Sequence, residues 1–466
     1  MDTDLANFAV YYLQKKGATY AEARMESREE QGFILKNSNP EIAGFDETTG
    51  LGIRFILNHT MGFATTNELA KDKIRDVIDR SLILANKAVP LSETISFSDA
   101  KAVNDTLKVK QKINLLNLDP SEKLKILQDL DKHVKSADTR YFSISDTLLK
   151  KYYINSDGIK LYSEIPRVKL FYFLSLTQGT NSIQRWLQKG AVSGYECLKT
   201  WNLEEELPQE LKALEKNMNE GISAPKGITD VICSSEVTGI AVHESAGHPY
   251  EADRIAGREA AQAGESFIKP SMIGERIGSD VVTVVDDPTL EGSYGFYLYD
   301  DEGIKARRKT MIEKGMIKEF MHDRSTSSQM KTESNGAARA CIYDVEPLVR
   351  MSNTFMLPGE HHEEELIRGV KKGIYLKSFM EWNIDDKRYN QKYVGCEAYL
   401  IENGEITRPV KAPALEITTP ALYSSIDAVS NKIELFAGNC GKGEPMQGIP
   451  VLMGGPTIRL RKVSIS

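Results

Sequence analysis

Two histidines and a glutamate occur close together in His243-Glu244-Ser245-Ala246-Gly247-His248, and these residue types bind and use divalent metal ions. The motif H-E-x-x-x-H is one residue longer than the H-E-x-x-H of common zinc proteases. Residues five apart on an α-helix point about 140° away from each other, whereas residues four apart share a face. Both imidazoles can therefore bind one ion only if the helix widens to a π-type turn or ends between them. Gly247 is the residue type that permits such a distortion.

Glu244 follows the first histidine directly, so its carboxylate would lie beside an ion held by the histidines. In metal-assisted hydrolysis, a carboxylate in this place takes a proton from water and later passes it to the leaving amine. The sequence therefore predicts Glu244 as a general base and not as a ligand. The structural alternative is a buried, hydrogen-bonded His243 beside an exposed His248, with no ion between them.

A tetrahedral catalytic site needs a third protein ligand, which leaves one position for water. Glu251 and Asp253 follow on the same segment, and Cys440 lies far away in the glycine-rich stretch 438–443. Flanking glycines let the backbone approach closely and leave the sulfur unshielded, which suits a thiolate ligand and equally an ordinary turn. The residues themselves leave all three candidates open.

The elements that must position these residues are partly marked in the sequence. Asp119, Pro120 and Glu122 form a helix start, with a capping residue, a proline at the first helical position and a glutamate three residues after the cap. Residues 203–219 have a helical pattern that ends near Gly221. The stretch 37–62 is rich in glycine and asparagine, and we expect turns there.

We expect an α+β protein of three parts. Residues 1–110 would form an N-terminal α/β domain, and residues 111–220 a middle domain of mixed α+β structure. Residues 221–466 would form a β-rich catalytic domain that carries the H-E-x-x-x-H helix. In this last part, 313–315 and 402–404 each separate two apolar runs and predict hairpins.

The composition disfavours several classes of protein. The chain has 466 residues with 66 acidic and 59 basic side chains, a net charge of −7, whereas nucleic-acid binders normally show a basic excess. No apolar run approaches the roughly 18 residues needed to span a bilayer. Five widely spaced cysteines fit reduced thiols better than a disulfide framework. We therefore expect a cytoplasmic protein with neither a nucleic-acid nor a membrane partner.

Other charged residues of the C-terminal part are less clearly linked to a function. The acids at 286, 287 and 300–302 are interpreted first as solvated loop residues, with roles beside a metal or at a substrate amino terminus as alternatives. For Arg350 we favour structural pairing with one of these acids over binding of a substrate carboxylate. The run His361-His362-Glu363-Glu364-Glu365 is interpreted as a solvated helix start rather than a metal site.

The order and spacing of motifs over residues 240 to 460 resemble the TldD/PmbA proteins, specifically their TldD-like, catalytically competent branch. The stretches that carry the resemblance are His243 to His248 with Glu251 and Asp253, Val284 to Asp287, Asp300 to Gly303, Arg350 to Thr354, Leu357 to Gly359, Glu397 to Tyr399, Ile401 to Glu405, and Gly438 to Lys442. The residues of one stretch, Ala340 to Tyr343, differ from those typical of the enzyme branch. This difference leaves the substrate preference open.

The resemblance implies a metallopeptidase that hydrolyses short or unfolded peptides in an enclosed cavity. It implies that His243, His248 and Cys440 hold one Zn²⁺ per chain and that Glu244 is the general base. It also implies a dimer, either a homodimer or a heterodimer with a PmbA-like subunit.

Two other functions remain open at this point. The chain could be the non-catalytic peptide-binding or assembly subunit of such a complex, although a purely structural partner need not keep all four residues. It could also be a cysteine hydrolase that uses Cys440, but the paired histidines and Glu244 would then have no role.

Overall fold

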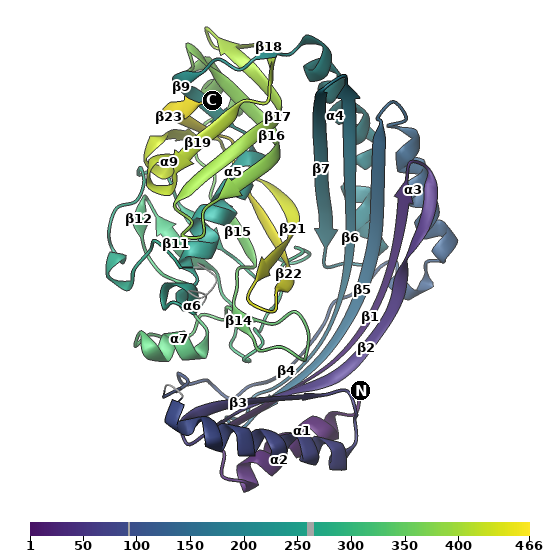
Figure 1. Cartoon of the computed structure of the whole chain (residues 1–466), viewed down its shortest axis with the longest axis vertical. Helices are drawn as coiled ribbons and strands as arrows, with labels where there is room; N and C mark the ends of the chain where they lie inside the picture. Colours follow the sequence, from purple (N-terminus) through teal and green to yellow (C-terminus); the bar gives the residue numbers. More distant parts are fainter. Residues whose placement is uncertain (92–93, 259–264) are drawn as a thin grey trace.

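The computed structural model describes residues 1–91, 94–258 and 265–466. It is a mixed α and β structure with much sheet, in agreement with the expected α+β class. A long curved sheet from the first half of the chain faces a compact, sheet-rich C-terminal part, as Figure 1 shows. Within the described ranges, no helix is both long enough and apolar enough to cross a membrane.

The curved sheet has seven strands in the order β3-β2-β1-β5-β6-β4, with β7 paired to β6. Neighbouring strands are antiparallel except β4, which runs parallel to β6. The strands are β1 (Tyr20–Lys36), β2 (Asn39–Leu57), β3 (Thr60–Thr66), β4 (Asn104–Lys108), β5 (Thr139–Asn155), β6 (Lys160–Gln178) and β7 (Asn181–Ala191). Because β1 pairs with β5, strands from both sides of residue 110 share one sheet. The division into three domains stays a prediction.

The turn-rich interpretation of residues 37–62 is wrong, because strand β2 occupies most of this stretch. Two of its glycines serve close packing rather than turns. A Cβ on Gly50 would lie 2.1 Å from Cζ of Tyr343, and one on Gly52 would lie 2.1 Å from the carbonyl oxygen of Tyr343. Glycine is therefore needed where a C-terminal loop lies directly on β2.

Helices cover the outer face and one end of the curved sheet. In Figure 1, α1 and α2 pack together at the end near β3. The predicted helix start at Asp119 is confirmed as a capping box on α3, and the predicted helix at 203–219 is confirmed as α4. The helices are α1 (Thr3–Lys15), α2 (Lys71–Ala88), α3 (Pro120–Lys132), α4 (Leu203–Glu220), α5 (Ser235–Val242), α6 (Ala252–Ile255), α7 (Arg324–Gln329), α8 (Glu363–Arg368) and α9 (Thr419–Ser425).

The C-terminal part contains a six-stranded sheet, an eight-stranded sheet and a two-stranded pair. The six strands, in spatial order, are β12 (Met316–Ile317), β11 (Lys309–Glu313), β10 (Val284–Asp286), β15 (Asn353–Met356), β22 (Gln447–Gly455) and β21 (Glu434–Lys442). The pair is β13 (Ala338–Arg339) with β14 (Leu348–Val349). The predicted hairpin at 313–315 is confirmed as the β11–β12 turn.

In the eight-stranded sheet, an extra pairing of β16 with β17 closes five strands into a ring. The strands are β8 (Ile222–Ser223), β9 (Gly227–Cys233), β16 (Lys372–Ile384), β17 (Asn390–Glu402), β18 (Glu405–Lys411), β19 (Ala414–Thr418), β20 (Ile426–Val429) and β23 (Ile458–Ile465). The hairpin predicted at 402–404 is confirmed between β17 and β18. Helix α5 packs against both β16 and β22, so it lies between the two larger sheets.

Candidate metal centre

The H-E-x-x-x-H motif continues directly from α5 in a widened helical turn. Ser234 caps the helix, since its hydroxyl accepts hydrogen bonds from the amides of Glu236 and Val237. Residues His243–Gly247 then form a π-helical turn, in which the amide of His248 donates to the carbonyl oxygen of His243. This bond spans five residues and brings the two ring centroids within 5.2 Å of each other, although the residues are five apart.

Packing around the widened turn requires a glycine at position 247. Its φ of −79° is open to any residue. A Cβ at this position, however, would lie 1.8 Å from Sδ of Met351. A glycine here therefore makes room for the Met351 side chain, in addition to lying at the end of the widened turn.

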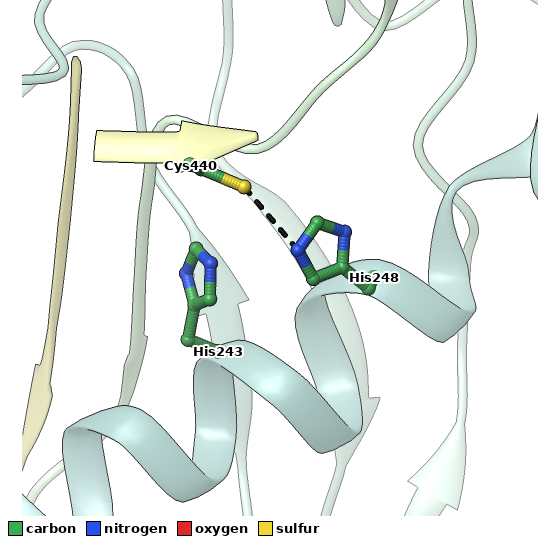
Figure 2. A group of neighbouring side chains, drawn as sticks. All are labelled: His243, His248 and Cys440. Carbon is green, nitrogen blue, oxygen red and sulfur yellow. Dashed lines mark hydrogen bonds between the residues drawn. The ribbon is translucent and has the colours of Figure 1, made fainter. Parts of the chain in front are cut away.

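Cys440 on β21 lies over the two imidazoles, as Figure 2 shows. Its Sγ is 3.2 Å from Nε2 of His248. One ligand atom from each of His243, His248 and Cys440 lies within 4.8 Å of the other two, and all three residues are buried. The structure therefore brings together the three side chains that the sequence suggested as metal ligands.

The far side of the His248 ring is held by a carboxylate. Nδ1 of His248 is 3.1 Å from Oε2 of Glu251, and Nζ of Lys442 is 3.1 Å from the same oxygen. Lys442 also pairs with Asp253 at 2.7 Å, and all of these groups are buried. Such a carboxylate fixes the ring so that Nε2 points toward Cys440, which is the usual arrangement around a metal-binding histidine.

Charges within the cluster favour a thiolate. Burial raises the pKa of Cys440, but His248, His243 and Arg350 outweigh this and hold the pKa well below its usual range. Burial lowers the pKa of His248, while Cys440 and Glu251 raise it to a net value above the ordinary one. Burial likewise raises the pKa of Glu251, but Lys442 and His248 bring it well below the usual range. Glu251 is therefore an anion that anchors both the ring and Lys442.

The geometry fits a tetrahedral ion. Zinc with nitrogen ligands at about 2.0–2.1 Å and a sulfur ligand at about 2.3 Å sets neighbouring ligand atoms roughly 3.3–3.6 Å apart. In the cluster, Sγ of Cys440 and Nε2 of His248 are 3.2 Å apart, and all three ligand atoms lie within 4.8 Å of one another, which is close to this range. Nδ1 of His243 is buried and has no hydrogen-bond partner among the described residues. Two imidazoles with a thiolate suit zinc best among common divalent ions.

Glu244 lies beside the cluster and pairs with an arginine from a distant hairpin. Nη1 of Arg388 is 2.5 Å from Oε2 of Glu244, and the carboxylate side chain is only 9% exposed. Arg388 sits in the turn between β16 and β17 with a φ of 63°. The hydroxyl of Thr419 donates to its carbonyl oxygen, which fixes the turn over the site.

The other candidate ligands have different places. Neither Glu251 nor Asp253 belongs to the group of converging donors, since both pair with Lys442. The run 361–365 is confirmed as a solvated helix start, because α8 begins at Glu363 and both histidines before it are exposed.

The interpretation of the remaining acids as solvated loop residues is wrong, because all of them are buried: Asp286, Asp287, Asp300, Asp301 and Glu302. Several form ion pairs within the protein, such as Glu302 with Arg54 at 2.7 Å. Arg350 is structural, but its partners are the carbonyl oxygens of Cys440 and Gln447 rather than one of these acids.

Sequence reasoning missed Arg388 and Lys442 as parts of the site. Lys442 lies two residues after Cys440, so it points to the same side of β21, and this spacing is the one local signal that marks it. Arg388 lies 144 residues from Glu244, and the residues around it in the sequence give no indication of the contact.

Family models match most of the chain. The C-terminal domain of PmbA/TldA metallopeptidases matches residues 226–466, domain 1 matches residues 21–85, and the central domain matches residues 113–218. A metalloprotease of Methanocaldococcus jannaschii is 32% identical over 443 residues, which cover 94% of this chain and 95% of that protein. A zinc metalloprotease TldD homolog of Saccharolobus solfataricus is 27% identical over 464 residues, which cover 97% of each.

A solved structure shares the fold. The crystal structure of TldE from Thermococcus kodakarensis superposes with a TM-score of 0.72 and 18% sequence identity. The superposition covers 99% of both chains. At this identity the likeness concerns the arrangement of helices and strands alone.

Proposed function

Because this chain belongs to the PmbA/TldA metallopeptidase family, we propose that it is a zinc-dependent peptidase that hydrolyses short or unfolded peptides. The resemblance to the TldD/PmbA proteins is confirmed by the family models and by relatives named TldD metalloprotease homologs. The proposal assigns one zinc ion per chain to His243, His248 and Cys440.

The convergence of the His248 and Cys440 donor atoms carries the proposal. Nε2 of His248 and Sγ of Cys440 are 3.2 Å apart although the two residues are 192 positions apart in the chain. Glu251 holds the opposite nitrogen of the same ring, so the ring faces the thiolate with its free nitrogen. A structural histidine would not need both a buried carboxylate on one side and a thiolate on the other.

The chain's own residues supply orientation and proton transfer. Zinc held by His243, His248 and Cys440 would supply Lewis acidity toward a peptide carbonyl and toward water. Arg388 holds Oε2 of Glu244, so we assign the proton transfer to Oε1. In this assignment Oε1 takes a proton from the attacking water and passes it to the amine that leaves. No covalent bond between substrate and protein is needed.

The remaining features of the proposal follow the family. The active form would be a dimer, either a homodimer or a heterodimer with a PmbA-like subunit, and it would act in the cytoplasm. The alternative function in such a dimer is that of a non-catalytic subunit, in which this chain would bind peptides without cleaving them.

The decisive experiment compares purified wild type with Glu244→Ala on unstructured peptides, with and without a chelator. We expect wild type to cleave and the chelator to stop cleavage. The variant should be inactive while still holding one zinc ion per chain by elemental analysis. Cleavage that survives chelation would rule out metal chemistry and favour a cysteine hydrolase. Cleavage that appears only with a PmbA-like subunit and persists in Glu244→Ala would assign the chemistry to that subunit.

A further inference from the structure

A cavity lies between the curved sheet and the β21–β22 hairpin, with a volume of about 240 Å³. The sheet contributes alternate residues of β1, β5 and β6, and the C-terminal part contributes Tyr294, Asn439 and their neighbours. In Figure 1 the inner surface of the curved sheet faces this hairpin. The cavity is thus enclosed by two parts of the chain that are far apart in sequence.

The wall of the cavity on β6 carries two cations without an acidic partner. Val168 and Leu170 point into the core under α3 and α4, so Arg167 and Lys169 point the other way, into the cavity. Arg167 makes one long hydrogen bond, from Nε to the carbonyl oxygen of Tyr294 at 3.4 Å. The ammonium group of Lys169 makes neither a hydrogen bond nor an ion pair with any residue that the structure describes.

Most other charged side chains around the cavity already have partners within the protein. Arg28 pairs with Glu30 at 2.7 Å, and Lys151 pairs with Asp301. Arg167 and Lys169 therefore have no acid of their own at ion-pair distance, although Glu30 and Asp301 lie near enough to act on them. Burial, with Arg339 and Arg28 nearby, lowers the pKa of Arg167 to about 10, and burial lowers the pKa of Lys169.

Enclosed cations that lack a partner weaken the fold, because their loss of water is not offset by an anion. The loss of stability is smaller if a bound ligand supplies a negative charge next to them. Guanidinium and ammonium groups two residues apart on one strand offer several N–H donors to the same oxyanion, a geometry suited to a carboxylate.

The cavity lies directly behind the strand that carries the candidate thiolate. Asn439 lines the cavity, and its neighbour Cys440 faces the histidines on the other side of β21. Arg339 ties the cavity wall to the same hairpin, since it donates to the carbonyl oxygen of Pro450 on β22. A ligand in the cavity would therefore rest on the element that also positions the metal centre.

We propose that this cavity is a binding site for the carboxylate group of a peptide, held by Arg167 and Lys169. The choice of a peptide as the source of the carboxylate rests on the proposed function. A carboxylate at the peptide's C-terminus and one on an acidic side chain offer the same chemistry, as does free phosphate.

Calorimetric titration of the full-length, zinc-loaded Glu244→Gln variant tests the site without cleavage. The probes are a neutral hexapeptide with a free C-terminal carboxylate, its C-terminal amide, an amidated hexapeptide with one glutamate, and inorganic phosphate. We expect at least one carboxylate peptide to bind about tenfold or more tightly than the neutral amide, since one charge-assisted contact is worth this much. The difference between the two carboxylate peptides identifies which carboxylate is bound.

The site is located by single changes on the same strand. Lys169→Gln and, separately, Arg167→Gln should abolish the preference for the carboxylate. Lys160→Gln, an exposed lysine on β6, should leave the preference unchanged. Lys169→Gln breaks no ion pair among the described residues, so it should fold normally by circular dichroism and melt no lower than its parent.

Three outcomes would overturn the proposal. They are equal binding of acid and amide peptides, a preference that survives both changes, and binding of phosphate with no preference between the peptides. The proposed peptidase function fails separately, if zinc-loaded wild type cleaves none of the probe peptides while the binding preference stands.

Discussion

Arg388 and Glu244 form a close ion pair beside the candidate metal centre, with Nη1 2.5 Å from Oε2. The arginine comes from the turn that joins β16 to β17, and the glutamate comes from the π-helical turn after α5. The pair fixes one oxygen of the carboxylate and aims the other. A residue outside the metal-binding motif thus controls the orientation of the proposed base.

Loss of the Arg388 guanidinium should slow catalysis without loss of metal. For Arg388→Ala we expect kcat to fall about 10- to 100-fold with a small change in KM, because an oriented base acts mainly in the transition state. Arg388→Lys should recover part of the loss, since it keeps the charge. Steady-state kinetics on zinc-loaded protein checks the split between kcat and KM.

Lys387→Ala is the matched control, because Lys387 is in the same turn but is mostly exposed and pairs only loosely with Glu265. It should leave both constants near those of wild type. An equal loss in Lys387→Ala would mean that the turn matters as a whole, and the assignment of Arg388 to Glu244 would be wrong.

Removal of the Glu251 charge should weaken zinc binding, although the proposed ligands and Glu244 are unchanged. Glu251→Gln keeps the shape of the side chain but loses the anion that holds His248 and Lys442. We expect a 10- to 100-fold loss of zinc affinity, about the effect of changing carboxylates behind metal-binding histidines. Competition with a chromogenic chelator measures the affinity, and Glu346→Gln, a partly exposed acid, serves as the control. Unchanged zinc affinity in Glu251→Gln would contradict the role of Glu251.

Metal removal should expose one thiol of five to alkylation. Burial raises the pKa of Cys197, Cys233 and Cys396 to about 12 each and also raises that of the partly buried Cys341. Neighbouring cations outweigh burial at Cys440 and hold its pKa well below the usual range. After chelation, iodoacetamide should therefore modify Cys440 first, and zinc should protect it. Mass spectrometry of the labelled peptides reads the result. Protection of Cys440 that is the same with and without zinc would argue against its role as a ligand.

His322 should make the fold sensitive to mild acid. Burial lowers its pKa to about 4, despite Asp323 and Glu319 nearby, from an unfolded value of about 6.5. Because the unfolded chain takes up this proton first, the free energy of unfolding should fall as the pH drops below about 6.5 and level off near 4. The full effect is about 3 kcal/mol. Urea unfolding of wild type and His322→Gln at pH 7 and pH 4.5 measures the difference. A parallel loss of stability in both proteins would show that other groups cause the acid sensitivity.

Local elements were predictable where the signal lies within a few residues. The capping box at Asp119 and the hairpin turn at Asn403 follow from side chains that contact their own neighbours. The widened turn at 243–247 was one of two geometries that the histidine spacing allowed. The assignment of Cys440 as the third ligand came from the family resemblance, because sequence spacing alone left Glu251 and Asp253 open.

Features that depend on distant packing were not predictable. Gly50 and Gly52 suggested turns, but they allow Tyr343, almost 300 residues away, to lie on a strand. The buried acid Glu302 resembled a loop residue because its partner Arg54 is 248 residues away. In both cases the deciding contact joins parts of the chain that no local window includes.

The long sequence separation within the metal cluster has a consequence during protein synthesis. His248 leaves the ribosome 192 residues before Cys440, a delay of about 10–40 s at ordinary elongation rates. During this period a nascent chain therefore contains both histidines and Glu244 but not Cys440, the third proposed ligand. If all three ligands are needed to bind the ion tightly, the proposed peptidase activity arises only after translation has passed β21.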